Sequence, residues 1–163
     1  MTSPALREPE HQVSPRAVRY WRIAAGLQAA VLIVPAVVAY VWVPVRPWWA
    51  TVLLVLLVLV TAGRVVVMPG LRYRIHRWEV TPTAIFTRSG WVSREERIAP
   101  LNRVQTVDSH QSPTMRPFKL ATITVTTASA AGPVRIDCLD EAVARRVVAE
   151  LTEITGTSEG DAT

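Results

Sequence analysis

Two long apolar segments constrain this chain more than any other feature of its sequence. They run from Ile23 to Val43 and from Trp48 to Met68; the first carries no charged residue and the second carries only Arg64. As helices rising 1.5 Å per residue, each is about as long as the 30 Å hydrocarbon core of a bilayer. A chain of 163 residues is too small to bury two such helices in a soluble core. The sequence therefore predicts two transmembrane helices.

The short connector between these segments, residues 44–47, predicts an antiparallel hairpin whose two tails lie on one side of the membrane. No small-residue cleavage site follows a short apolar stretch, which argues against a removed secretory signal. The connector has Arg46 alone, whereas the tail side is rich in arginine: Arg7, Arg16, Arg19, Arg22, Arg72, Arg74 and Arg77. By the positive-inside rule, both termini are predicted to be cytoplasmic in a multi-pass protein of the cell membrane.

Composition divides the chain into four predicted parts. Residues 1–20 are expected to be a disordered basic tail, 21–70 the transmembrane hairpin, 71–155 a cytoplasmic domain, and 156–163 a second disordered tail that begins at the helix-stopping Gly156. The one cysteine, Cys138, excludes an intramolecular disulfide and suits a reducing compartment. The net charge of +5 resides largely in the juxtamembrane arginines, so it predicts no nucleic-acid partner.

Within the domain, alternating apolar and polar residues predict about six or seven antiparallel strands. The clearest is the run Ala121 to Thr126, which forms a predicted hairpin with the run Val134 to Cys138. The other predicted strands end at Val80, or span 84–88, 91–98 and 103–110. After Leu139 the period changes to that of a helix, with Asp140 as N-cap and an apolar stripe of Val143, Val147, Leu151 and Ile154.

Candidate catalytic and metal sites fail on geometry. Asp108, Ser109 and His110 are the residue types of a hydrolase triad, but neighbours in a strand point to opposite faces. His76 and His110 lack a third spaced ligand for a metal, and Cys138 alternates with apolar residues, as a core residue does. No phosphate-binding glycine loop is present in the sequence. We therefore expect no enzyme activity, no cofactor and no metal.

Three stretches of the domain resemble a known family. They are Tyr73 through Gly90, Arg97-Ile98-Ala99-Pro100-Leu101-Asn102-Arg103-Val104-Gln105-Thr106-Val107, and Leu120-Ala121-Thr122-Ile123-Thr124-Val125-Thr126-Thr127. Together with the paired apolar segments before them and the closing helix, they resemble the bacterial PH-like domain of the YdbS-like membrane proteins, formerly a domain of unknown function. The resemblance implies a membrane-anchored α+β protein in which a bent antiparallel barrel of about seven strands ends in a C-terminal helix. Lys119 stands where that family commonly has glycine.

Two functions of different class fit these expectations. The first, which we favour, is a membrane-tethered module for protein interaction or assembly, with a membrane-protein partner or a second copy of the chain. The second is binding of anionic lipid headgroups at the inner leaflet by Arg72, Arg74 and Arg77. The same arginines are needed for topology, and the turn Thr81-Pro82-Thr83 lacks a basic cluster. These two facts place headgroup binding second.

Overall fold

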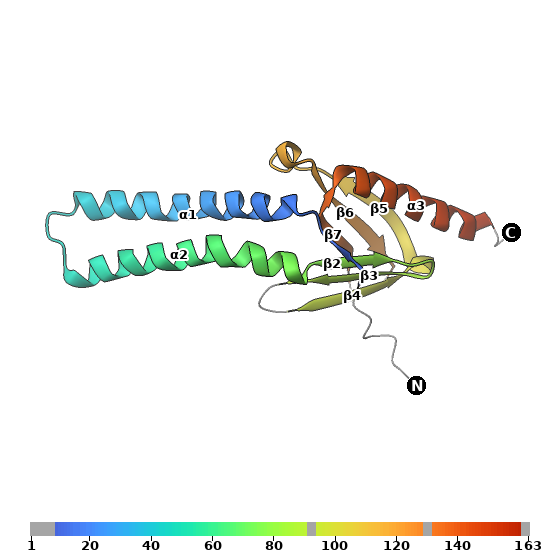
Figure 1. Cartoon of the computed structure of the whole chain (residues 1–163), viewed down its shortest axis with the longest axis horizontal. Helices are drawn as coiled ribbons and strands as arrows, with labels where there is room; N and C mark the ends of the chain where they lie inside the picture. Colours follow the sequence, from blue (N-terminus) through green and yellow to red (C-terminus); the bar gives the residue numbers. More distant parts are fainter. Residues whose placement is uncertain (1–8, 91–93, 129–131, 161–163) are drawn as a thin grey trace, which may run out of the picture. The chain divides into compact units, whose positions relative to one another are not determined.

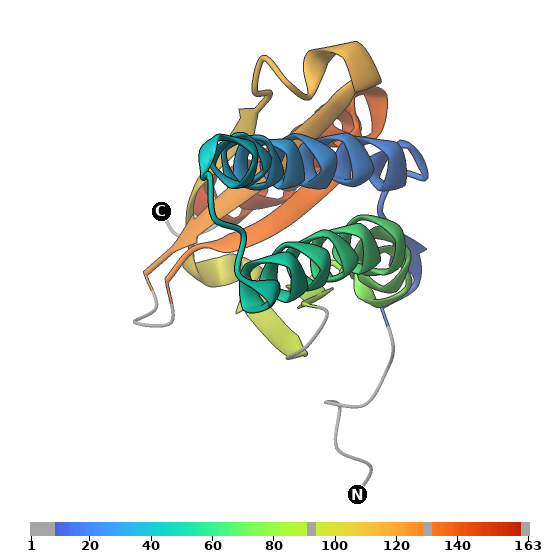
Figure 2. The same ribbon diagram turned by 90° about the vertical axis from the view of Figure 1, so that its left-hand side faces the viewer.

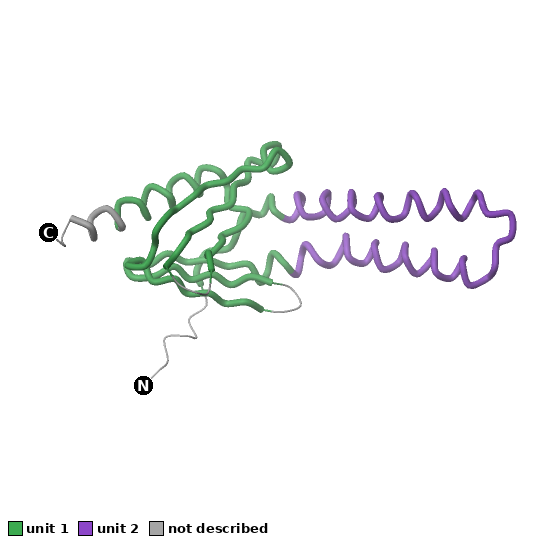
Figure 3. Tube along the Cα trace, turned by 180° about the vertical axis from the view of Figure 1, so that it is seen from behind, with its two compact units in different colours: residues 1–17, 72–163 green, residues 18–71 purple. Residues whose placement is uncertain are grey.

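The computed structural model describes residues 9–90, 94–128 and 132–160, with side chains as far as Ile154. Two compact units make up the chain: residues 18–71, and residues 1–17 together with 72–163 (Figure 3). The first unit is the central part of a helical hairpin. The second is a domain assembled from segments on both sides of that hairpin in the sequence.

The hairpin consists of α1 (Arg16–Trp42) and α2 (Trp48–Ile75), joined by a short connector (Figures 1 and 2). Both predicted apolar segments are helical, apart from Val43, which lies just beyond α1. Each helix extends past its predicted segment at the tail end, since α1 begins at Arg16 and α2 continues through Pro69 to Ile75. Both are long and apolar enough to cross a membrane, and few of their side chains are buried. Lipid is the environment that suits such surfaces.

Seven strands form two antiparallel sheets in the described ranges of the chain. The first sheet has the order β1 (His11–Gln12), β2 (Arg77–Val80), β3 (Ala84–Ser89) and β4 (Glu95–Pro100). The second has the order β5 (Val104–His110), β6 (Leu120–Thr127) and β7 (Val134–Asp140). The number of strands agrees with the prediction, but the described strands do not close into a barrel. The short 3-10 helix η2 (Leu101–Arg103) follows Pro100, which has no N–H to donate, and separates β4 from β5.

The strand β1 corrects the prediction of a disordered tail over residues 1–20. His11 pairs with Trp78 and Gln12 with Arg77, so a segment before the hairpin completes a sheet that follows it. Ser14 fixes the end of this segment, because its N–H donates to the Cys138 carbonyl at 3.0 Å. Its hydroxyl accepts from the Arg16 N–H at the start of α1 and donates to Asp140. Residues 1–8 lie outside the described residues.

The C-terminal helix α3 (Glu141–Gly160) packs on β5, β6 and β7 (Figure 1). On the predicted stripe, Val147 and Leu151 are buried, and Leu151 has no exposed surface. The prediction that Gly156 ends this helix is wrong, since α3 continues to Gly160. One glycine inside a helix costs only about 1 kcal/mol, which the rest of the helix can tolerate.

Two non-glycine residues among those that the structure describes have a left-handed backbone. Cys138 (φ 57°) occupies a register shift in β7, where Ala121 pairs with Leu139 but Ile123 pairs with Ile136. Its side chain is buried, as predicted. Lys119 (φ 54°) follows the 3-10 helix η3 (Arg116–Phe118) and starts the turn into β6. This is the position where the family resemblance leads one to expect glycine, the residue that adopts this conformation without strain.

Candidate functional site

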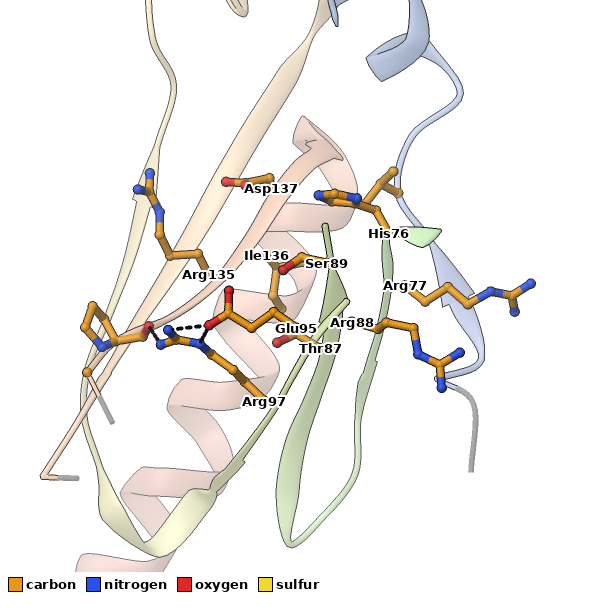
Figure 4. A pocket seen from close by; sticks show the side chains of 13 residues that line it. His76, Arg77, Thr87, Arg88, Ser89, Glu95, Arg97, Arg135, Ile136 and Asp137 are labelled. Atoms are coloured by element: carbon orange, nitrogen blue, oxygen red, sulfur yellow. Dashed lines mark hydrogen bonds and ion pairs between the residues drawn. The ribbon is translucent and has the colours of Figure 1, made fainter. Parts of the chain in front are cut away.

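A polar cleft of about 420 Å³ opens between the first sheet and β7 (Figure 4). Thr87 and Ser89 of β3, Glu95 and Arg97 of β4, and Asp137 of β7 are among its lining residues. Val13, just before α1, and His76, directly after α2, also line it. Two residues of the cleft therefore lie within a few positions, in the sequence, of the ends of the membrane helices.

The polar lining follows from the alternation along two paired strands. Ile85 pairs with Ala99, Thr87 with Arg97, and Ser89 with Glu95. Alternate residues point to one face of a sheet, so these three pairs share a face. Ile85 and Ala99 are buried in the core, whereas Ser89 and Glu95 at the other end offer a hydroxyl and a carboxylate. The apolar core therefore stops at Ile85, and the remaining space is suited to water or a polar ligand.

Most charged groups of the cleft have an ion-pair or hydrogen-bond partner. Arg97 Nη2 lies 2.6 Å from Glu95 Oε1, and Arg97 Nη1 donates to the Pro133 carbonyl at 3.1 Å. Arg88 Nε lies 2.9 Å from Glu96 Oε1. Arg135 is exposed, and the described residues provide it with no carboxylate. Because Glu95 lies among these guanidinium groups (Figure 4), the cleft does not have the uniform charge of a dedicated anion site.

His76 is the buried titratable group of the cleft, with 4% of its surface exposed. Its Nδ1 lies 2.9 Å from the Arg72 carbonyl, and its Nε2 lies 3.4 Å from Arg72 Nε. A neutral ring with the proton on Nδ1 satisfies both contacts, since it donates to the carbonyl and accepts from the guanidinium. Burial, and then the charge of Arg72, lower the pKa of His76 below its ordinary value. Burial, the charge of Arg72 and the contact of Nε2 with the Arg72 guanidinium therefore favour the neutral form of His76, directly after α2.

The two histidines considered for a metal site lie on different elements. His76 faces the cleft, whereas His110 is exposed at the end of β5 and is not among the cleft residues. Among the residues with described positions, no group of three metal-ligating side chains occurs. Asp108, Ser109 and His110 are consecutive in β5 and pair with Thr124, Ile123 and Thr122. Successive residues of a strand point to opposite faces, so this geometry does not assemble a triad.

The three arginines predicted to contact lipid headgroups occupy different environments. Arg72 is partly buried, and its Nη2 lies 3.8 Å from Asp137 Oδ2. Arg74 is exposed on the last turn of α2. Arg77 belongs to β2, and its guanidinium donates to the Pro9 carbonyl at 3.5 Å. Of the three, Arg74 alone has an exposed side chain, and a common headgroup site made by all three stays a prediction.

Two of the strands that end a sheet, β4 and β5, differ in the character of their outer edges, a feature that the sequence did not reveal. The outer edge of β4 carries Glu95, Glu96, Arg97 and Pro100, which are the residue types that discourage pairing with another strand. The outer edge of β5 carries one acidic residue, Asp108, and one register shift between Val104 and Thr106, but it has no proline, lysine or arginine. Most side chains of β5 are exposed, and no strand among the described residues pairs with that edge. The edge of β5 is therefore open to an additional strand.

Comparison with known proteins identifies the family. The model of the family described as "Bacterial PH domain" matches residues 18–155. UPF0699 transmembrane protein YdbS of Bacillus subtilis (strain 168) is 33% identical over 125 residues, which cover 75% of this chain and 79% of that protein. No solved structure matches significantly. The matched region includes nearly all of the apolar hairpin, the strands β2 to β7 and most of α3, and this chain therefore belongs to the bacterial PH domain family, as a transmembrane protein similar to YdbS.

Proposed function

We propose that this protein is a non-catalytic, membrane-tethered module that binds another protein, or a second copy of itself, at the cytoplasmic face of the cell membrane. The observation that carries the proposal is the open edge of β5. A sheet edge with a single charged residue and no proline offers a row of backbone groups to an extended partner segment. Two membrane helices hold this edge near other membrane proteins, which raises their effective concentration.

The contrast with β4 strengthens the proposal. Both strands end a sheet, so both would attract unwanted strands if neither were protected. The protecting residues are concentrated on β4, where Arg97 also donates across to the Pro133 carbonyl. The edge of β5 has fewer protecting residues than the edge of β4, as expected of an edge that binds a partner strand.

The proposed topology has support from the strand pairing. Strands separated by a bilayer cannot form hydrogen bonds, so the pairing of β1 with β2 supports a common side for the N-terminal segment and the domain. The arginines that flank the hairpin then favour the cytoplasm as that side.

Headgroup binding remains the alternative, with weaker support. Arg72 lies near Asp137 and His76, and Arg77 contacts the backbone of residue 9. Arg74 is left as the exposed charge of the group, worth about 1 kcal/mol at an anionic surface. Such a contribution is small beside the anchoring by two membrane helices.

Lysines introduced on the edge of β5 test the proposal. The variant Gln105→Lys/Ser109→Lys places two charges on exposed positions of β5. Its matched control, Ala142→Lys/Ala149→Lys, adds the same charge on exposed positions of α3. Full-length protein would be cross-linked in cell membranes and purified in mild detergent. We expect the β5 variant to lose the partner protein that is cross-linked to the original chain, and the α3 variant to keep it. Equal recovery of the cross-linked partner from both variants would contradict the proposal that the edge of β5 binds the partner.

A further inference from the structure

An apolar crevice of about 460 Å³ lies between α1 and α2 at the connector end of the hairpin. Its lining includes Ala36 and Ala39 of α1 and Leu53 and Leu57 of α2. The small alanines leave room that two larger side chains would have filled. The volume lies within the range of small-molecule sites in proteins, about 300 to 1,000 Å³.

One end of the crevice is polar and cationic. Arg46, in the connector, places its guanidinium carbon 5.6 Å from the centre of the Tyr40 ring, and both residues line the crevice. The Tyr40 hydroxyl lies 2.7 Å from Thr51 Oγ1 and so links the two helices. Aromatic rings and an arginine at this position are typical of the level of lipid headgroups.

Arg46 is also the only charged residue between Arg22 and Arg64 in the sequence. A guanidinium has five N–H donors, and among the described residues Arg46 donates to one acceptor, the Val41 carbonyl at 3.4 Å. Its charge has no carboxylate neighbour anywhere in the hairpin segment, since residues 23–63 contain no acidic residue. Arginine binds phosphate oxygens well, because its planar fork of donors matches their geometry.

We propose that this crevice is a binding site for one anionic phospholipid. An acyl chain lies between Ala36, Ala39, Leu53 and Leu57, and the phosphate receives hydrogen bonds from Arg46. In a membrane, water does not fill a crevice with apolar walls, whereas an acyl chain restores the close packing that its lining lacks. The charge of Arg46 selects an anionic headgroup over a zwitterionic one. This site is separate from the edge of β5 and does not depend on the proposed function.

The test uses the full chain, purified in detergent and stripped of lipid. Phosphatidylglycerol or phosphatidylcholine is added back, and native mass spectrometry counts the retained lipid. We expect one phosphatidylglycerol to be retained about fivefold more tightly than phosphatidylcholine, the factor that one arginine contributes near an anionic lipid. Arg46→Gln should abolish this preference. Ala36→Leu, which fills the crevice, should release both lipids, whereas Ala30→Leu, on an exposed position of the same helix, should release neither.

Because Ala36→Leu could disturb the hairpin, quenching of tryptophan fluorescence provides a second measurement that does not need this variant. Trp49 lines the crevice, so a phosphatidylglycerol with brominated acyl chains should quench its fluorescence in bilayers. Quenching should fall in Trp49→Phe and should also fall, with Trp49 intact, in Arg46→Gln. If Arg46→Gln retains phosphatidylglycerol as tightly as the original protein and shows the same quenching, the lipid is an unspecific neighbour of the helices and the proposal is wrong.

Discussion

Replacing Leu151 with alanine should remove a large part of the free energy of unfolding of the domain. Leu151 has no exposed surface and lies on the face of α3 that packs on the second sheet. Leucine-to-alanine changes in cores cost about 2 to 5 kcal/mol, and the cost rises with the volume of the cavity left behind. Because Leu151 is completely enclosed, we expect about 3 to 5 kcal/mol, against a total of about 5 to 15 kcal/mol for a typical domain.

Pulse proteolysis of the full chain in nanodiscs, across a urea series, measures this loss without removing the hairpin. At a slope of about 1.5 kcal/mol per M, the midpoint of unfolding should fall by about 2 to 3 M. Ile98→Ala is the matched control, since Ile98 is a large apolar residue of the domain with 54% of its surface exposed. Its midpoint should move by less than about 0.5 M. An unchanged midpoint in Leu151→Ala would refute the docking of α3 on the sheets.

Three further predictions concern the backbone, the buried histidine and the topology. Lys119→Gly should raise the stability of the domain by roughly 0.5 to 1 kcal/mol, since it relieves a left-handed residue, and Lys119→Val should lower it in the same urea assay. Because the pKa of His76 is lowered on folding, the unfolded chain binds more protons; stability should therefore fall as the pH drops below about 6.5, and His76→Gln should have a flatter pH profile. A membrane-impermeant maleimide should label Val45→Cys on intact cells but not Ser158→Cys, and the reverse result would overturn the proposed orientation.

The sequence predicted those elements whose signals are local and repeated. The two apolar segments and the alternation from Ala121 to Thr126 each carry many residues of one pattern, and all three became the predicted elements. The strand β1 has two residues, too few for a pattern, and its partner Trp78 lies beyond the hairpin. The prediction of a barrel rested on the family resemblance alone. In the structure β4 and β5 belong to different sheets, and the 3-10 helix that begins at Leu101 separates them.

The candidate site was less accessible to sequence analysis than the fold. The sequence shows that the polar residues Thr87 and Ser89 alternate with other residues after Ile85. That they line a polar cleft depends on their pairing with Arg97 and Glu95, which the sequence does not show. The open edge of β5 could not be predicted, since edge status depends on the strand order of the whole sheet. The contact of Arg72 with Asp137 could not be predicted either, because the two residues are far apart in the sequence.

Site-specific photo-cross-linking in living cells tests the proposed assembly function most directly. A photoreactive phenylalanine analogue at Thr106, exposed on β5, would be compared with the same analogue at Ala149, exposed on α3. Irradiation should produce a protein adduct of discrete mass, either a partner or a dimer, from position 106 and none from position 149. Equal adducts from both positions, or no protein adduct from position 106, would contradict the account.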